Sequence, residues 1–403
     1  MTLDSHSFLT APRAPIPITA YALTNCLGES TAEVLDNLFA GNCGLAPCRW
    51  PLPFSTYAGE AKGGLAPLPE AEKAFDSRAA RLLARTLDEM AQSAARAIRT
   101  WGSHRVGLVL GTSTGGIAET EAAYETFKTA GSLPERFDFE RQHSFGGLVE
   151  FARRRTGIQG PAYAVSTACS SSGKVFGCAQ RLIESGLCDA VLVGGSDSLC
   201  QTTLRGFGSL EVVSPELCHP FSAQRNGLNI GEGAALLLLE RHPSGGARAM
   251  ANLLGVGESS DAWHMSHPHP EGIGALAAME QALSQASLSP SQVDHVNAHG
   301  TGTKANDEVE GRAIQKLLGS GVPVVSTKAY TGHMLGAGGA SEAVFAIASI
   351  QRGLVPMALR AEPIDSAFEL NIPTEVLRRD VNVVLSNSFA FGGSNVCVAL
   401  GQA

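Results

Sequence analysis

Short apolar runs alternate with segments of helical periodicity along the chain, and this alternation constrains the fold more than any other feature. Strands buried on both faces form continuous apolar runs, and helices between them cover the faces, so the pattern predicts α/β layers. A polar stretch with Pro and Gly at 240–249 predicts a boundary between two halves, 1–245 and 246–403. The apolar runs are VGLVLG (106–111), AVLVGG (190–195), GAALLLLE (233–240), VDHVNAHG (293–300) and VNVVLSNS (381–388).

Composition narrows the class of protein. The net charge of −8 over 403 residues argues against general nucleic-acid binding. The nine cysteines include no C-x-x-C pair, which fits neither a disulfide framework nor a zinc site and predicts a reducing, cytoplasmic location. Residues 1–18 lack the apolar core of a secretory signal, and every apolar run is too short to span a bilayer, so we expect no membrane insertion.

Cys169 lies between a predicted strand and a predicted helix. The β-prone run 163–167 precedes it, and the apolar residues of 173–185 recur at helical spacing. This position puts the sulfur beside the first free N–H groups of a helix, which favours a thiolate and can hold a developing oxyanion. A lone cysteine is more often an inert core residue. The strand-turn-helix context and two histidine motifs favour a nucleophile instead.

The two histidines stand in glycine-rich motifs of their own. His299 ends a predicted strand, and the acids of 306–310 after it begin a helix and are expected to order the loop. His333 follows Lys328 by five residues, and a buried lysine there would keep nearby imidazoles neutral and stabilise negative charge. Cys169 lies in a small-residue turn after a strand of the first half, and His299 lies in a similar turn after a strand of the second half. This shared arrangement suggests that the two halves arose by an old duplication.

These motifs resemble those of the β-ketoacyl-acyl-carrier-protein synthases, the KAS I/II-type condensing enzymes of the thiolase superfamily, over nearly the whole chain. The resemblance implies the thiolase fold, an α/β fold of two pseudo-symmetric βαβαβαββ halves in a five-layered α/β/α/β/α arrangement. The ordered motifs are LGTSTGG (110–116), STACSSS (166–172), PFSAQRNGLNIGEGAALLLLE (220–240), NAHGTGTKANDEVE (297–310), STKAYTGHMLGAGGASE (326–342) and NSFAFGGSNV (387–396).

The resemblance also implies a reaction, the decarboxylative Claisen condensation of malonyl carrier protein with an acyl chain held on Cys169. The N–H groups of Cys169 and Phe391 would form the oxyanion hole, and Phe389 and Phe391 would form a gate between the acyl and malonyl steps. Neutral His299 and His333 would bind the thioester oxygen as the enolate forms.

The remaining implied roles concern substrate binding and the setting of the site. Thr301 and Thr303 would contact the phosphopantetheine arm, and Lys328 would maintain the electrostatics of the site. Thr114, near the dimer interface, and Phe207 would border the acyl pocket. No metal and no organic cofactor is implied. The implied partners are an acyl carrier protein and a second subunit, in a homodimer or in a heterodimer with a chain-length factor.

Three further interpretations remain open at this stage. A thiolase would need a second catalytic cysteine, for which Cys397 is the candidate, although it follows FGGSNV inside a predicted strand. A non-catalytic acyl-carrier-binding scaffold subunit would lack the nucleophile. A catalytic heterodimer subunit would keep it.

The substrate stays open between fatty-acid elongation and a specialised polyketide or aryl-polyene pathway. The reason is that the chain departs from the family pattern at 170–174, Asn226, Ala390 and Ser394.

Two surface features have competing interpretations. A basic patch could receive an acidic carrier protein, or its cations could belong to solvated helix faces. The segment 264–269, with three histidines and an interrupting proline, is more typical of a substrate-channel or surface loop than of a metal site. The patch comprises Lys73, Arg78, Arg81 and Lys128.

Overall fold

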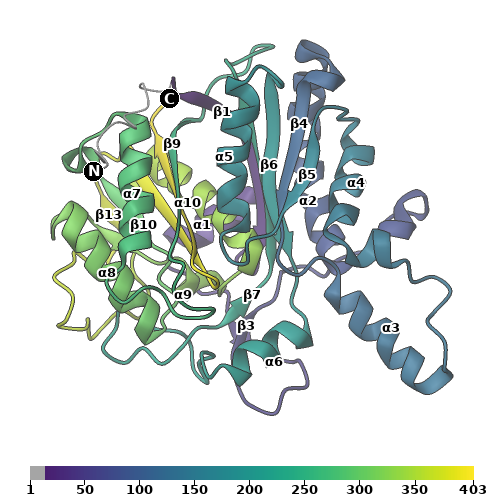
Figure 1. Ribbon diagram of the computed structural model, residues 1–403, viewed down its shortest axis with the longest axis horizontal. Helices are drawn as coiled ribbons and strands as arrows, with labels where there is room; N and C mark the ends of the chain where they lie inside the picture. The colour runs from purple at the N-terminus through teal and green to yellow at the C-terminus, as the bar shows by residue number, and fades with distance from the viewer. Residues whose placement is uncertain (1–13) are drawn as a thin grey trace, which may run out of the picture.

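The computed structural model describes residues 14–403, so most of the N-terminal segment 1–18 lies outside the described residues. One ten-stranded mixed sheet runs through the molecule (Figure 1). In spatial order its strands are β11 (Val324–Val325), β10 (His295–Asn297), β14 (Val383–Ala390), β15 (Ser394–Gly401), β9 (Ala251–Ser260), β1 (Ile16–Asn25), β8 (Gly233–Glu240), β6 (Ala190–Asp197), β4 (Val106–Gly111) and β5 (Ala162–Val165).

The sheet consists of two halves with the same topology. Outward from the centre, one half runs β1-β8-β6-β4-β5 and the other runs β9-β15-β14-β10-β11. In both halves the first two pairings are antiparallel and the next two are parallel. The halves join where Ile16–Ile18 of β1 pair antiparallel with Ala251–Leu253 of β9. The proposed division near residue 245 lies between β8 and β9 and stays a prediction.

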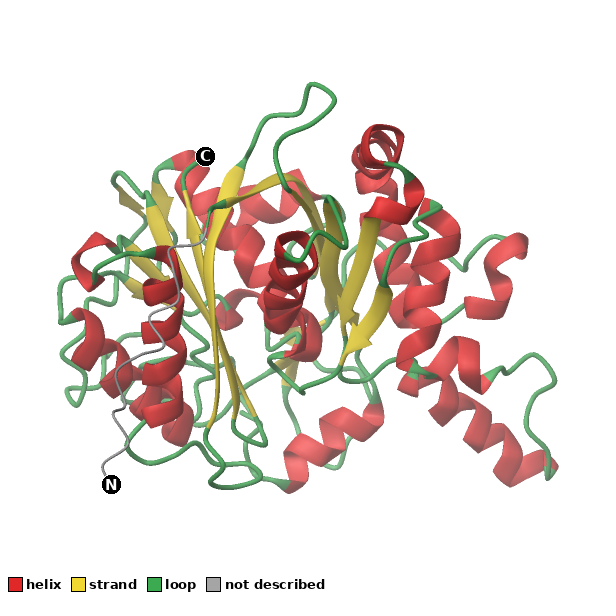
Figure 2. Ribbon diagram, turned by 45° about the horizontal axis from the view of Figure 1, so that its top comes forward, coloured by secondary structure: helices red, strands yellow, loops and turns green. Residues whose placement is uncertain are grey.

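Helices form three further layers, which completes the five-layered thiolase arrangement. Helices α5 and α10 lie between the two halves of the sheet, α2 and α4 cover the outer face of one half, and α7 covers that of the other, against α8 (labelled in Figure 1; Figure 2 shows the layers from another side). The helices are α1 (Thr31–Phe39), α2 (Arg78–Trp101), α3 (Ile117–Ala130), α4 (Phe145–Thr156), α5 (Ser171–Glu184), α6 (Gln201–Ser209), α7 (Ile273–Ala286), α8 (Lys304–Leu318), α9 (Lys328–Thr331) and α10 (Gly338–Arg352).

Smaller elements complete the description. The short strands belong to two minor sheets, ordered β12-β13 and β2-β3-β7, of which β3 pairs parallel with β7 beneath the main sheet (Figure 1). Their bounds are β2 (Ala46–Pro47), β3 (Tyr57–Gly59), β7 (Ile230–Gly231), β12 (Leu354–Val355) and β13 (Leu377–Arg378).

The two central helices approach each other where both begin. A Cβ built on Gly339 of α10 would lie 2.6 Å from the backbone N of Gly173 of α5, so no larger residue fits without movement. Beside this contact, the Ala340 N–H donates to Ser172 Oγ at 2.9 Å. The glycine contact therefore brings the N-terminal ends of α5 and α10 together, and with them the segments that precede each helix.

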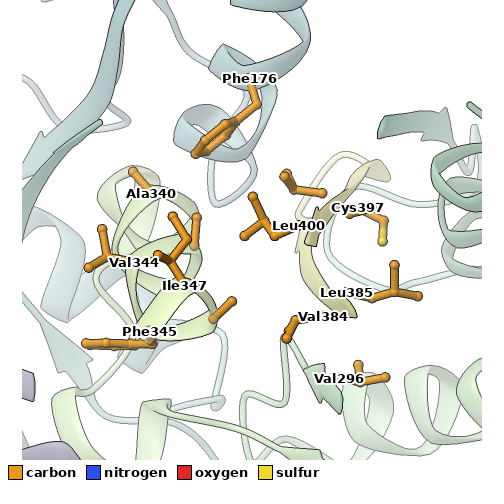
Figure 3. Packing of buried hydrophobic residues seen from close by; sticks show 14 of the residues in the cluster. Phe176, Val296, Ala340, Val344, Phe345, Ile347, Val384, Leu385, Cys397 and Leu400 are labelled. Carbon is orange, nitrogen blue, oxygen red and sulfur yellow. The ribbon is translucent and has the colours of Figure 1, made fainter. Parts of the chain in front are cut away.

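The largest hydrophobic core surrounds these helices. Phe176 of α5 lies opposite Val344 and Ile347 of α10, and Leu400 of β15 packs toward them (Figure 3). These side chains are fully or almost fully buried. Because α10 is enclosed by sheet and helix on every side, even its serine and glutamate positions are buried. Burial at this depth holds the reactive segments at the helix starts to a narrow range of positions.

Most predicted elements are confirmed. The apolar runs at 106–111 and 233–240 are β4 and β8 with the expected bounds, and the stretch at 240–249 links β8 to β9. The expected run 293–300 is shorter as a strand, because β10 ends at Asn297 and the residues from His299 form a loop. No helix within residues 14–403 has the length and hydropathy to cross a bilayer.

The proposed correspondence between the Cys169 and His299 turns is wrong. Cys169 follows β5, the outermost strand of its half, whose counterpart is β11 rather than β10. The counterpart of the Cys169 turn is therefore the segment after β11, which carries Lys328 and His333. His299 follows β10, and β4 occupies the equivalent place in the first half. The duplication is visible in topology, but the reactive residues do not occupy equivalent positions.

The α5–α10 contact predicts opposite effects for two neighbouring glycines. Gly339→Ala should lower the free energy of unfolding by about 1–3 kcal/mol, because its Cβ meets the backbone of Gly173. Gly338→Ala should leave stability unchanged or raise it by about 0.5–1 kcal/mol, because Gly338 has helical torsions and open space at its Cβ. Urea unfolding of both variants measures the difference, and equal midpoints would contradict the close approach.

Candidate active site

Cys169 occupies a strained turn between β5 and α5. The preceding residue, Ala168, has φ of +51°, a conformation that costs a residue with a Cβ about 1–3 kcal/mol and is concentrated at functional sites. The Cys169 side chain is buried, and the backbone N–H groups of Phe391 and of Cys169 itself lie close enough to its sulfur to lower the pKa of the thiol. Two N–H groups that converge on one small volume can stabilise an oxyanion formed there.

Burial of Cys169 opposes the thiolate that the helix start is expected to favour. The pKa of Cys169 is raised to about 12, mainly by burial and to a smaller extent by the nearby carboxylate of Asp197. The charge of Lys328 and the two N–H groups lower it, but by less than burial raises it. The helix N-terminus is where the sequence predicted it. Burial is the largest influence on the pKa of the sulfur.

Hydrogen bonds from the backbone of the His299 loop hold this residue in place. Its N–H and that of Gly300 donate to the two carboxylate oxygens of Glu310 at 2.8 and 2.7 Å. Asp307 similarly accepts the N–H of Gly302 at 3.1 Å and that of Phe221 at 2.9 Å. Burial raises the pKa of Glu310 to about 7, although these donors oppose the shift. The acids of 306–310 therefore order the loop, as the sequence predicted.

Lys328 and His333 both lie in the link between β11 and α10. Lys328 Nζ pairs with Glu342 Oε1 of α10 at 2.5 Å, and both side chains are almost fully buried. The His333 N–H donates to the Asn229 carbonyl at 2.7 Å, and the Gly231 N–H donates to the His333 carbonyl at 2.9 Å. These bonds tie a segment of the second half to the first half.

The two imidazoles lie side by side. Their ring centroids are 5.3 Å apart with an angle of 85° between the planes. Burial lowers the pKa of each imidazole well below its ordinary value, and the charge of Lys328 lowers both further. Neither Nδ1 atom has a hydrogen-bond partner within residues 14–403. Two neutral imidazoles at this separation can bind one shared acceptor.

One cavity joins the nucleophile to the histidines. It contains most of the predicted site residues and a loop segment at 266–268 that the sequence assigned to a channel or surface. The ring of Phe207 from α6 stacks on that of Phe391, with centroids 5.5 Å apart and planes 20° apart. Predicted site residues that line the cavity are Cys169, Phe207, His299, Thr301, Thr303, His333, Phe389 and Phe391.

Thr114 does not line this cavity. It lies beside the carboxylate of Asp197, a residue that the sequence motifs did not single out. Asp197, at the end of β6, is fully buried and accepts the Thr114 hydroxyl at 2.8 Å and the Gly336 N–H at 2.6 Å. It also accepts the N–H groups of Ser113 and Thr114, each at 3.0 Å. Asp197 thereby joins the loop after β4 to the link before α10. The place of Thr114 in the acyl pocket stays a prediction. An acid directly after the run AVLVGGS was the available signal.

The proposed basic patch is not a set of free cations. Lys73 pairs with Glu70 at 3.0 Å, Arg81 with Asp76 at 2.6 Å and Lys128 with Glu125 at 2.7 Å. Arg78 pairs with the buried carboxylate of Glu232 at 2.5 Å. A carboxylate lies beside each of the four cations, as expected for solvated helix faces, and the interpretation as a docking patch stays a prediction.

Cys397 and the segment 264–269 lack the surroundings of a catalytic cysteine and of a metal site. Cys397 is buried inside β15 and pairs with Asn387 of β14, so it is a core residue rather than a second catalytic cysteine in a turn. The segment 264–269 is a loop that follows β9. Within the described chain, no three or more His, Cys, Asp or Glu side chains are grouped so that they could hold a metal ion.

Comparison with known proteins gives consistent matches. The family model described as β-ketoacyl synthase, N-terminal domain, matches residues 13–244, and the one described as β-ketoacyl synthase, C-terminal domain, matches residues 250–362. The chain is 35% identical to nodulation protein E of Rhizobium meliloti, over 74% of this chain and 76% of that protein. It is also 35% identical to 3-oxoacyl-[acyl-carrier-protein] synthase 2 of Rhizobium meliloti (strain 1021), over 73% of each.

A solved structure extends the likeness over nearly the whole chain. It is the ketosynthase ApeO in complex with its chain length factor ApeC, from Xenorhabdus doucetiae. The match has a TM-score of 0.90 and 39% sequence identity, and it covers 96% of this chain and 98% of that one.

The electrostatics of the histidine pair can be tested without any substrate. Imidazole NMR of the wild type should show no titration of His299 or His333 near pH 6.5, because burial and Lys328 both disfavour the protonated rings. The double variant Lys328→Met/Glu342→Gln removes both charges of the ion pair, so both imidazole pKa values should rise while remaining below about 6.5. Unchanged imidazole pKa values in this variant would contradict the assigned influence of Lys328.

Proposed function

The chain belongs to the β-ketoacyl synthase family and is a carbon–carbon bond-forming acyltransferase, and from this premise we propose a role for each residue of the cavity. The reaction is the decarboxylative Claisen condensation of malonyl carrier protein with an enzyme-bound acyl group, in fatty-acid or polyketide synthesis. One observation carries the assignment: a single cavity contains a cysteine faced by two N–H groups and two neutral imidazoles.

In the first half-reaction Cys169 exchanges with the carrier thiol. The sulfur attacks the thioester carbon, and the N–H groups of Cys169 and Phe391 bind the oxyanion of the tetrahedral intermediate. The carrier sulfur then leaves as the carbonyl reforms. The thiol proton passes through a neutral imidazole of the cavity to the leaving sulfur, so the exchange is proton-neutral. A protonated resting thiol suits this step because no free thiolate has to be maintained.

In the second half-reaction the two imidazoles act on the malonyl thioester. His299 and His333 donate hydrogen bonds to its carbonyl oxygen, the carbon–carbon bond to the carboxylate breaks, and CO₂ leaves as the enolate forms. The enolate carbon attacks the acyl carbon on Cys169, and the sulfur departs and takes up one proton. Lys328 supports this step through the neutrality of both imidazoles, since its charge disfavours their protonation.

The remaining residues bind and separate the substrates. Thr301 and Thr303, whose hydroxyls are 2.9 Å apart at the cavity wall, bind the amides of the phosphopantetheine arm. Phe391 and Phe389 form the gate.

We also propose that the reaction needs no resident metal or organic cofactor, because backbone N–H groups and imidazoles supply the electrophilic assistance. The nine free cysteines support a reducing, cytoplasmic location.

We propose further that the chain is the catalytic subunit of a heterodimer with a chain-length factor. Two observations support this subunit arrangement over an independent monomer. The ApeO ketosynthase, in complex with its chain length factor, is similar over 96% of this chain. In addition, β5 ends the sheet with a neighbour on one side only, and its Tyr163 is 39% exposed. An unpaired edge strand is a natural site of association with another chain. A homodimer is the competing arrangement.

Three substitutions separate the half-reactions. Intact-protein mass spectrometry after incubation with acyl carrier proteins should find an acyl adduct on the wild type and on Cys397→Ala, but none on Cys169→Ala. His333→Ala should form the adduct and lose condensation by roughly 10²–10³-fold, the usual effect of losing one oxyanion donor. A His333→Ala enzyme that condenses normally would remove that residue from the mechanism.

The heterodimer proposal makes a separate prediction about the chain on its own. Expressed alone, it should give little condensation product, and adding a chain-length-factor subunit should restore turnover in a complex of one copy of each. Native mass spectrometry and product analysis measure both quantities. A homodimer with full turnover in the absence of any second protein would refute the heterodimer.

A further inference from the structure

Helix α6 is held in place by few contacts. Of its nine residues, within a segment that is fully described, Leu204 alone is fully buried. Arg205 donates to the Pro51 carbonyl at 2.8 Å, and a Cβ on Gly208 would lie 2.3 Å from the Phe54 ring. Elements with so little buried surface belong to the least stable parts of a fold. The position of α6 therefore depends strongly on each contact at its two ends.

The start of α6 is capped by a different helix. Its own N-cap residue, Cys200, makes no side-chain capping bond. Instead Glu121 of α3 accepts the N–H of Gln201 at 3.0 Å and that of Thr202 at 2.6 Å, with one carboxylate oxygen each. The first N–H groups of a helix have no partner within the helix, and its positive end attracts a carboxylate. Glu121 thus satisfies both needs from outside α6.

The end of α6 contacts the gate. Phe207, two residues before the helix ends, stacks on Phe391, whose backbone N–H faces the Cys169 sulfur. On its other side the gate turn is tied by its backbone, since the Gly392 N–H donates to the Met265 carbonyl at 2.8 Å. The side chain of Phe391 consequently rests on α6. A shift of α6 would therefore move the surface against which the Phe391 ring packs.

We propose that α6 sets the resting position of the Phe391 gate, with Glu121 and Phe207 as positioning residues at its two ends. The inference rests on the proposed function, in which the gate keeps the malonyl step closed until Cys169 is acylated. Glu121 does not line the cavity. It acts on the gate through α6, and loss of its capping bonds lets the Phe391 ring leave its place against Phe207 more often.

A substrate-free experiment tests the mechanical link. The rate of alkylation of Cys169 by iodoacetamide, followed by peptide mass spectrometry to separate it from the other cysteines, reports how often the gate opens. Glu121→Ala should raise this rate about five-fold, as expected for loss of one helix cap. Glu121→Gln, which keeps one acceptor oxygen, should give a smaller rise. Glu125→Ala is the matched control, because its partner Lys128 lies on the surface of the same helix.

Kinetics then separate positioning from simple damage. Compared with the wild type, Glu121→Ala and Phe207→Ala should release CO₂ from malonyl carrier protein alone faster, relative to their rate of condensation when an acyl primer is supplied. The Glu125→Ala control should keep the wild-type ratio. An unchanged alkylation rate in both Glu121 variants would overturn the proposal. So would an equal loss of acylation, decarboxylation and condensation. A wild type that never forms an acyl adduct would instead refute the proposed function, and the alkylation result would still decide the role of α6.

Discussion

The contact between Gly173 and Gly339 is the constraint on which the site depends. It lets α5 and α10 begin at almost the same point, deep between the two halves of the sheet. Cys169 lies two residues before the start of α5, and His333 lies five residues before the start of α10. Residues far apart in the chain therefore meet because two helix starts can touch without side chains between them. Burial on all sides then makes this arrangement rigid.

Rigidity of this kind requires that buried charges be satisfied. Asp197 receives N–H and hydroxyl donors from both halves, Glu310 holds the His299 loop, and Glu342 neutralises Lys328. The same burial keeps the reacting groups uncharged at rest, since it raises the pKa of Cys169 and lowers those of both histidines. The site therefore holds a thiol and two imidazoles with a fixed cation nearby. That combination suits charge that develops only during reaction.

The gate contrasts with this rigid centre. Phe391 is placed by a turn and by α6, a short helix with one fully buried residue. A chemical centre that must stay fixed and a gate that must move are thus built from elements of different packing. The capping of α6 by Glu121 connects the moving part to α3, a helix that projects from the body of the molecule (Figure 1).

The amino-acid sequence by itself determined the local structure: the buried strands, the turn at Cys169, the loop at His299 and the chemistry of each motif. These follow from apolar periodicity and from the placement of small residues, which act over a few positions. Only the tertiary structure decided which turns are equivalent, that each cation from Lys73 to Lys128 lies beside a carboxylate, and that burial raises the pKa of the Cys169 thiol. It also revealed Asp197 and Glu121, whose partners lie some 80 residues or more away in the chain. The ion pairs, hydrogen bonds and burial of a side chain depend on residues that the fold brings next to it. These residues are distant in the chain, so the local sequence does not identify them.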